Sequence, residues 1–152
     1  MGCLLSVKNL EQRFDLDRSI LSQIRFERGR FVRRKRVVHA VNSISFDLEE
    51  GQVYSLVGES GCGKSTAARS IIRLIEPAGG SVRYRGQDIA HIPLGEMLPL
   101  RKKMQMIFQD PYASLNPRQN VMEILTEPML FHKVAAGKKE ARARALDLLS
   151  RV

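Results

Sequence analysis

The stretch GESGCGKST, residues 58–66, decides the fold expected for this chain. The fixed positions of the pattern G-x-x-x-x-G-K-[ST] are filled by Gly58, Gly63, Lys64 and Ser65. An apolar run at 53–57 precedes the match, and residues 64–76 follow it with one apolar helical face. Strand, glycine-rich loop and helix are the context that this motif requires, so the sequence predicts a phosphate-binding loop on an α/β fold.

The chemistry of the loop follows from its composition. Glycines let successive backbone N–H groups surround an anion, and the start of the next helix adds free N–H groups and positive potential. Lys64 is expected to contact the β- and γ-phosphates and to act in catalysis, and the Ser65 hydroxyl to hold Mg²⁺. The predicted nucleotide-binding residues are Gly58, Glu59, Ser60, Gly61, Cys62, Gly63, Lys64, Ser65 and Thr66.

Net charge and cysteine content say less about the function of the chain than the glycine-rich loop does. The chain of 152 residues carries a formal charge of +9, and much of that charge lies in RFERGRFVRRKR, residues 25–36. We expect residues 15–36 to form an inserted basic loop, which is either solvated or in contact with nucleic acid or an anionic membrane. Two aromatics in this run are too few to indicate base stacking, so nucleic acid is not an expected partner. Two cysteines, Cys3 and Cys62, indicate a reduced chain.

Periodicity predicts the remaining elements. The predicted strands cover residues 4–10, 43–48, 53–57, 81–86 and 104–109. The predicted helices cover residues 64–76, 94–103 with Pro99 inside, 119–130 and 138–152, with a loop at 110–118. Gly2 and Ser6 fit the pattern M-G-x-x-x-[ST] of N-myristoylation, but a simple first strand explains the same residues.

The loop alone does not distinguish a GTPase, a kinase and a transport ATPase, although no N-K-x-D motif follows it. Four segments, at 40–52, 56–66, 104–118 and 140–152, narrow the choice. They read AVNSISFDLEEGQ, LVGESGCGKST, MQMIFQDPYASLNPR and EARARALDLLSRV. On these segments the chain resembles the ATP-binding subunits of ATP-binding cassette (ABC) importers, specifically the dipeptide, oligopeptide and nickel group.

The resemblance implies roles for further residues. Gln109 would be the Q-loop glutamine, which contributes to Mg²⁺ and to the attacking water, whereas its composition alone suggests a surface glutamine at a strand end. Phe14 would stack on adenine, although it could equally belong to a core. Residues 112–118 would face a membrane subunit, or simply form a rigid turn.

The implied fold is a P-loop α/β ATPase with an antiparallel β-subdomain and the start of a helical subdomain, spanning residues 1–152. The family's signature motif, its Asp-Glu strand end (Walker B) and its switch histidine have no counterpart in these residues. We therefore expect the amino-terminal part of a nucleotide-binding domain that binds ATP and Mg²⁺ without hydrolysing ATP. Phosphoryl transfer requires that the γ-phosphate is held, the metal is placed and the attacking water is oriented at the same time.

The implied partners are two membrane permease subunits, a second ATP-binding subunit and, indirectly, an extracytoplasmic substrate-binding protein. The implied location is the cytoplasmic face of the inner membrane, with peptides or nickel as the cargo. Two alternatives remain: a non-catalytic nucleotide-binding module, and an ABC ATPase that acts on nucleic acid.

Overall fold

The computed structural model describes residues 2–16, 24–27, 30–33 and 36–152. The chain divides into two compact units, Met1–Met97 and Leu98–Val152, and each is described by itself. None of the helices in the described residues is long and apolar enough to cross a bilayer.

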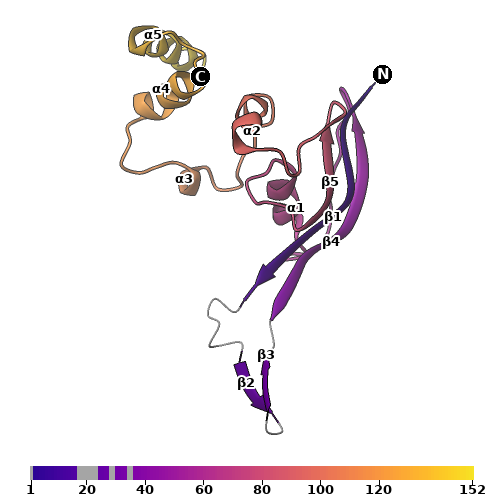
Figure 1. Cartoon of the computed structure of the whole chain (residues 1–152). Coiled ribbons are helices and arrows are strands. Elements are labelled where there is room, and N and C mark those ends of the chain that lie inside the picture. The colour runs from indigo at the N-terminus through magenta and orange to yellow at the C-terminus, as the bar shows by residue number, and fades with distance from the viewer. Residues whose placement is uncertain (1, 17–23, 28–29, 34–35) are drawn as a thin grey trace. The chain divides into compact units, whose positions relative to one another are not determined.

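The first unit is built on a four-stranded antiparallel sheet (Figure 1). Its strands are β1 (Cys3–Asp15), β4 (Val37–Glu49), β5 (Gly79–Tyr84) and β6 (Gln87–Asp88), in the order β4-β1-β5-β6. One face of the sheet is apolar and buried, and its central side chains are Val7, Leu10 and Val82. The opposite face is polar, with Lys8 bridging to Asp47 across β1 and β4 at 2.8 Å. This alternation is what a half-buried antiparallel sheet requires, and it confirms the strands predicted at 4–10, 43–48 and 81–86.

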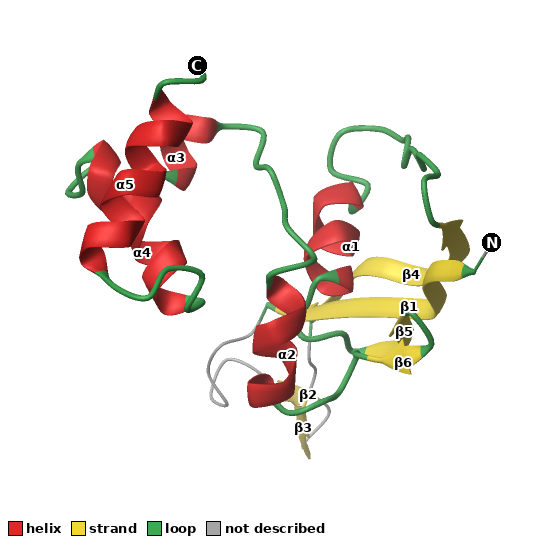
Figure 2. Cartoon of the chain, turned by 90° about the horizontal axis from the view of Figure 1, so that it is seen from above, coloured by secondary structure: helices red, strands yellow, loops and turns green. Residues whose placement is uncertain are grey.

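Helix α1 (Lys64–Ile71) packs on the sheet through β1 and β4, with Ala67 and Ser70 buried (Figure 2). The apolar pattern predicted a helix to residue 76, but the helix ends five residues earlier. Arg73 adopts a left-handed φ of 54°, and Leu74 N–H donates to the carbonyl of Arg69 while Arg73 N–H donates to that of Ser70. This pair of bonds is a Schellman motif, which ends a helix whatever the sequence pattern beyond it.

The predicted loop at 15–36 lies partly outside the described residues. Where the structure describes it, it contains β2 (Ile24–Glu27) and β3 (Arg30–Arg33), paired antiparallel with Phe26 opposite Phe31. The expectation of a loop was therefore wrong for these segments, because aromatic and β-branched residues favour paired strands even in a basic run. The base of the insertion is closed by Leu16 N–H, which donates to the carbonyl of Arg36.

Two predicted strands, 53–57 and 104–109, are not strands in the structure. A strand exists only through hydrogen bonds to a neighbour, and among the described residues neither segment has a paired strand. Val53 and Val57 are each 89% exposed, whereas Met104 and Met106, on the alternating face of 104–109, are half-buried and Phe108 is 40% exposed.

The remaining helices are α2 (Leu94–Arg101), α3 (Pro111–Ser114), α4 (Val121–Phe131) and α5 (Lys138–Leu149). The prediction for 94–103 is confirmed, with Pro99 inside α2, whereas the predicted loop at 110–118 contains the single turn α3. Asn120 and Glu123 form a reciprocal capping box at the start of α4. Of the predicted apolar face of α5, Ala141 and Ala145 are buried, where α5 contacts α4.

Candidate phosphate-binding site

The glycine-rich loop ends at Gly63, the N-cap of α1, and Lys64 is the first helical residue. The first turn of α1 contains no acidic residue that would oppose an anion. The first N–H groups of a helix have no intrahelical acceptor, and the helix dipole places positive potential at the same end. The start of α1 therefore has the electrostatics of a phosphate site, and the predicted residues 58–66 lie together there.

Two of the glycines are required by backbone geometry. Gly61 has a φ of 80° and Gly63 a φ of 98°, values that other L-residues rarely adopt. Gly63 is also pressed against β4, because a Cβ at this position would overlap the backbone carbonyl oxygen of Ala40. The loop is thus held against the edge strand of the sheet through a contact that a side chain would break.

Lys64 folds back over the loop. Its Nζ donates to the carbonyl of Gly58 at 2.8 Å and to that of Glu59 at 2.6 Å, and it lies 3.5 Å from the Sγ of Cys62. The ammonium is therefore held at the loop, on the side chain that the motif assigns to phosphate contact.

Two cavities, each of about 350 Å³, lie between the loop and β4. The first is lined from β4 by residues 39–42 and Ile44, and from the loop side by Cys62, Gly63 and Lys64. The second is lined by Val38, His39 and Ala40, and by residues 61–66 of the loop and helix. Space for a ligand thus adjoins both the phosphate loop and β4.

A bulge in β4 sets which side chains face the loop. Gln12 pairs with Val41 and both are buried, but Arg13 pairs with His39, so Ala40 is the extra residue of β4. Phe14, two residues beyond Gln12, then lies on the same face of β1 as Gln12, and its partner across the ribbon is Val38.

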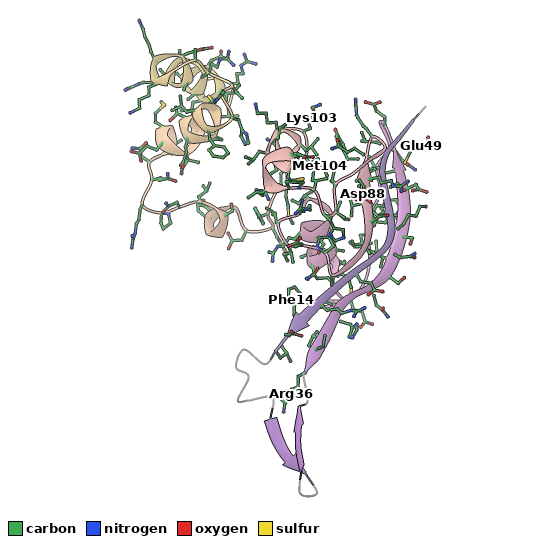
Figure 3. The ribbon with its side chains drawn as sticks, viewed as in Figure 1. Phe14, Arg36, Glu49, Asp88, Lys103 and Met104 are labelled. Carbon is green, nitrogen blue, oxygen red and sulfur yellow. The ribbon has the colours of Figure 1, made fainter. Side chains whose placement is uncertain are left out.

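Phe14 lies near the end of β1 (Figure 3), and its side chain is 38% exposed. An aromatic ring and an aliphatic side chain therefore lie on the helix-bearing face of the sheet, and Val38 also lines the second cavity.

Gln109 belongs to the second unit, whereas Lys64 and Ser65 belong to the first. The role of Gln109 therefore stays a prediction. Ser65 lines the second cavity with Lys64 and Thr66, so its hydroxyl is available to a cation at that position. No group of three or more His, Cys, Asp or Glu residues that could hold a metal occurs within the described ranges.

The residues that sequence reasoning missed are Val38, His39 and Ala40, which form the β4 wall of the second cavity. No sequence signal placed them there. Their position depends on pairing across the insertion at 15–36 and on a one-residue bulge, neither of which has a local pattern.

Comparisons with known proteins place these features in a family. The family described as ABC transporter matches residues 41–152. The chain is 44% identical over 149 residues to the glutathione import ATP-binding protein GsiA of Escherichia coli (strain K12), and 45% identical to that of Escherichia coli O157:H7. Each alignment covers 98% of this chain and 22% of the relative, so the chain spans about a fifth of the length of these relatives.

Solved structures share the fold. The ATP-binding cassette MJ0796, in a dimeric post-hydrolysis state bound to ADP and Pi, matches with a TM-score of 0.70 at 23% identity. That match covers 96% of this chain and 56% of the cassette. CbiO1 from Clostridium perfringens, part of an ABC transporter complex, matches with a TM-score of 0.63 at 20% identity, over 99% of this chain and 51% of its own. The predicted fold, a P-loop α/β ATPase cassette, is thereby confirmed.

Proposed function

Because the chain belongs to the ABC transporter family, we propose that it binds ATP and Mg²⁺ at residues 58–66, within the ATP-binding subunit of a peptide importer. The observation that carries the proposal is the placement of Lys64 and the free N–H groups of α1 at one glycine loop. Backbone donors and a lysine ammonium converge there on a position that suits the β- and γ-phosphates.

The loop and the residues around it would contact different parts of the nucleotide. The N–H groups and Lys64 would hold the phosphates, and the Ser65 hydroxyl would be a ligand of Mg²⁺. Phe14 would stack on the adenine, because an aromatic face offers a large contact area to a purine and its cross-strand partner Val38 lines the second cavity. Bound Mg²⁺ would neutralise phosphate charge.

The second unit would contribute Gln109, whose amide can both donate to and accept from a water or a metal-bound oxygen without adding charge. The sequence contains no counterpart of the family's Asp-Glu strand end or signature motif. We therefore propose that this chain alone binds ATP without hydrolysing it, and that hydrolysis requires those elements together with a second ATP-binding subunit.

Peptide import is the proposed process, since the relatives at 44–45% identity are named for the import of glutathione, a tripeptide. The proposed partners are two membrane permease subunits, a second ATP-binding subunit and an extracytoplasmic substrate-binding protein. The proposed location is peripheral, on the cytoplasmic face of the inner membrane.

The nucleotide site is tested by Lys64→Ala. Because one hydrogen bond to a charged group contributes about 1.5–3 kcal/mol, loss of the ammonium should weaken ATP binding by at least about tenfold. Titration calorimetry of the 152-residue chain with Mg·ATP measures the affinity, and Lys103→Ala, an exposed lysine of the second unit, is the matched control. Equal affinity of wild-type chain and Lys64→Ala would refute the proposed function.

A further inference from the structure

Two strands of the basic insertion form a sheet of their own. Strands β2 and β3 pair with each other (Figure 1), and within the described residues neither pairs with the four-stranded sheet. A two-stranded hairpin alone is only marginally stable in water, and packing against a further surface stabilises it. We propose that this hairpin packs on the surface of an anionic lipid bilayer. The inference goes beyond nucleotide binding and rests on the membrane-peripheral location proposed above.

The insertion holds most of the positive charge of the chain. Residues 25–36 contain seven arginine or lysine residues and one glutamate, so their net charge is +6, against +9 for the whole chain. An anionic membrane surface attracts a polybasic segment of this kind, and each arginine or lysine near the surface strengthens binding about fivefold. Charge therefore directs the insertion, and not the rest of the chain, to a bilayer.

The register of the hairpin separates apolar from charged positions. One face carries the pairs Ile24–Arg33 and Phe26–Phe31, and the other face carries the pairs Arg25–Val32 and Glu27–Arg30. Three of the four positions on the first face are thus apolar, and three of the four on the second are charged. An element with this division lies in the membrane interface with its apolar face against the acyl boundary, as amphipathic helices do.

Basic positions on both faces can act on the same membrane. Packed sheets lie about 10 Å apart, so one layer of strands is about as thick as the screening length of about 8 Å at physiological salt. Arginine also carries its charge at the end of a long apolar stem, which can extend along an apolar surface toward the headgroups. Arg25 and Arg30 therefore add to the attraction although they lie opposite the apolar face.

Nucleic acid presents the same negative charge, but the hairpin fits a bilayer better. Proteins that bind single strands stack successive bases on separate aromatic side chains, whereas Phe26 and Phe31 occupy one paired position of the register. The chain also belongs to a family of transporters, which act at membranes. The combination of apolar face and positive charge thus points to lipid.

Flotation of the 152-residue chain with lipid vesicles tests the proposal, because aggregated protein does not float. The vesicles contain phosphatidylcholine alone, or with about one third phosphatidylglycerol. The wild-type chain should bind the anionic vesicles at least about tenfold more tightly than the neutral ones. Raising the salt concentration from about 0.1 M to about 1 M should remove most of this preference.

Two variants separate the charge from the apolar face. The triple variant Arg25→Gln, Arg30→Gln, Arg33→Gln should bind anionic vesicles at least about tenfold more weakly than wild type. The double variant Phe26→Ser, Phe31→Ser keeps every charge and should bind at least about fivefold more weakly, because its apolar contribution is lost. Phe26→Leu with Phe31→Leu retains an apolar face and should bind within about twofold of wild type.

The matched control removes three exposed basic residues of α5, through Lys138→Gln, Lys139→Gln and Arg142→Gln. This variant has the same net charge as the triple arginine variant, and it should bind anionic vesicles within about twofold of wild type. Equal weakening in the two charge variants would overturn the proposal, and so would wild-type binding in the serine double variant. Displacement by a DNA duplex, at the same concentration of negative charge as the lipid, would assign the hairpin to nucleic acid and overturn it as well.

Titration with Mg·ATP keeps this inference separate from the proposed function. The hairpin variants should keep the wild-type affinity for ATP, and Lys64→Ala should float with anionic vesicles as the wild-type chain does. If the wild-type chain binds ATP but does not float, only the bilayer contact is refuted. If it floats but binds no ATP, the proposed nucleotide site is refuted and the bilayer contact stands.

Discussion

The contact between Gly63 and Ala40 predicts an unusually large effect of adding one methyl group. In Gly63→Ala, the new side chain meets two obstacles. The φ of 98° is unfavourable for alanine, at a cost of about 1–2 kcal/mol. The Cβ also overlaps the Ala40 carbonyl oxygen, so β4 must shift, and overpacking of this kind costs about 1–3 kcal/mol more. The expected loss in the free energy of unfolding, the sum of the two terms, is about 2–5 kcal/mol.

Gly61→Ala is the matched control. Gly61 has a φ of 80°, but a Cβ there would have no heavy atom within 4 Å, so only the backbone term applies, about 1–2 kcal/mol. Urea unfolding of the two variants and the wild-type chain, followed by far-UV circular dichroism, separates the terms. If Gly63→Ala and Gly61→Ala are destabilised equally, the close approach of β4 to the loop does not exist and the reasoning is refuted.

Three further predictions concern other parts of the chain. A thiol reagent should modify Cys62 and block ATP binding, and saturating Mg·ATP should slow the modification; equal labelling rates with and without ATP would contradict the loop placement. The pKa of Glu140 lies below its ordinary value because the Ala136 N–H and then Arg144 donate to its carboxylate. Its stabilising effect is therefore present above the unfolded-state pKa and is lost as the pH falls through the lower folded pKa. The difference in the free energy of unfolding between the wild-type chain and Glu140→Gln should accordingly shrink as the pH is lowered from about 6 to about 3. A difference that stays constant over this range would contradict the stabilising role of the Glu140 carboxylate. Since Val53 is 89% exposed in an apolar run, we expect the chain to self-associate in a concentration-dependent way. Val53→Lys should reduce this association in sedimentation experiments, and unchanged association would exclude the run as its cause.

The glycine loop and the start of the helix that follows it could be predicted because their signal is local. Gly58, Gly63, Lys64 and Ser65 occupy fixed positions in one short segment, and the helix that follows has its own periodicity. The strand at 43–48 was predictable for a similar reason, since its alternation of apolar and polar residues shows which of its faces is buried.

Other parts of the prediction failed where structure depends on distant partners. Residues 53–57 have the composition of a strand, but composition supplies no hydrogen-bonding neighbour, and none is paired with them among the described residues. The end of α1 at Ile71 depends on the left-handed φ of Arg73, and an arginine in the sequence does not predict that backbone conformation.

The sequence by itself determined that this protein has a glycine loop between an apolar run and a helix, the context on which the proposed phosphate site rests. Only the tertiary structure decided what surrounds that loop. The bulge at Ala40 sets the face on which Val38 lies and pairs it with Phe14, and the carbonyl of Ala40 lies against Gly63. The reason is that side chains of a strand alternate with a period of two, so one extra residue in β4 changes which side chains reach the site, and a bulge is fixed by pairing across the sheet.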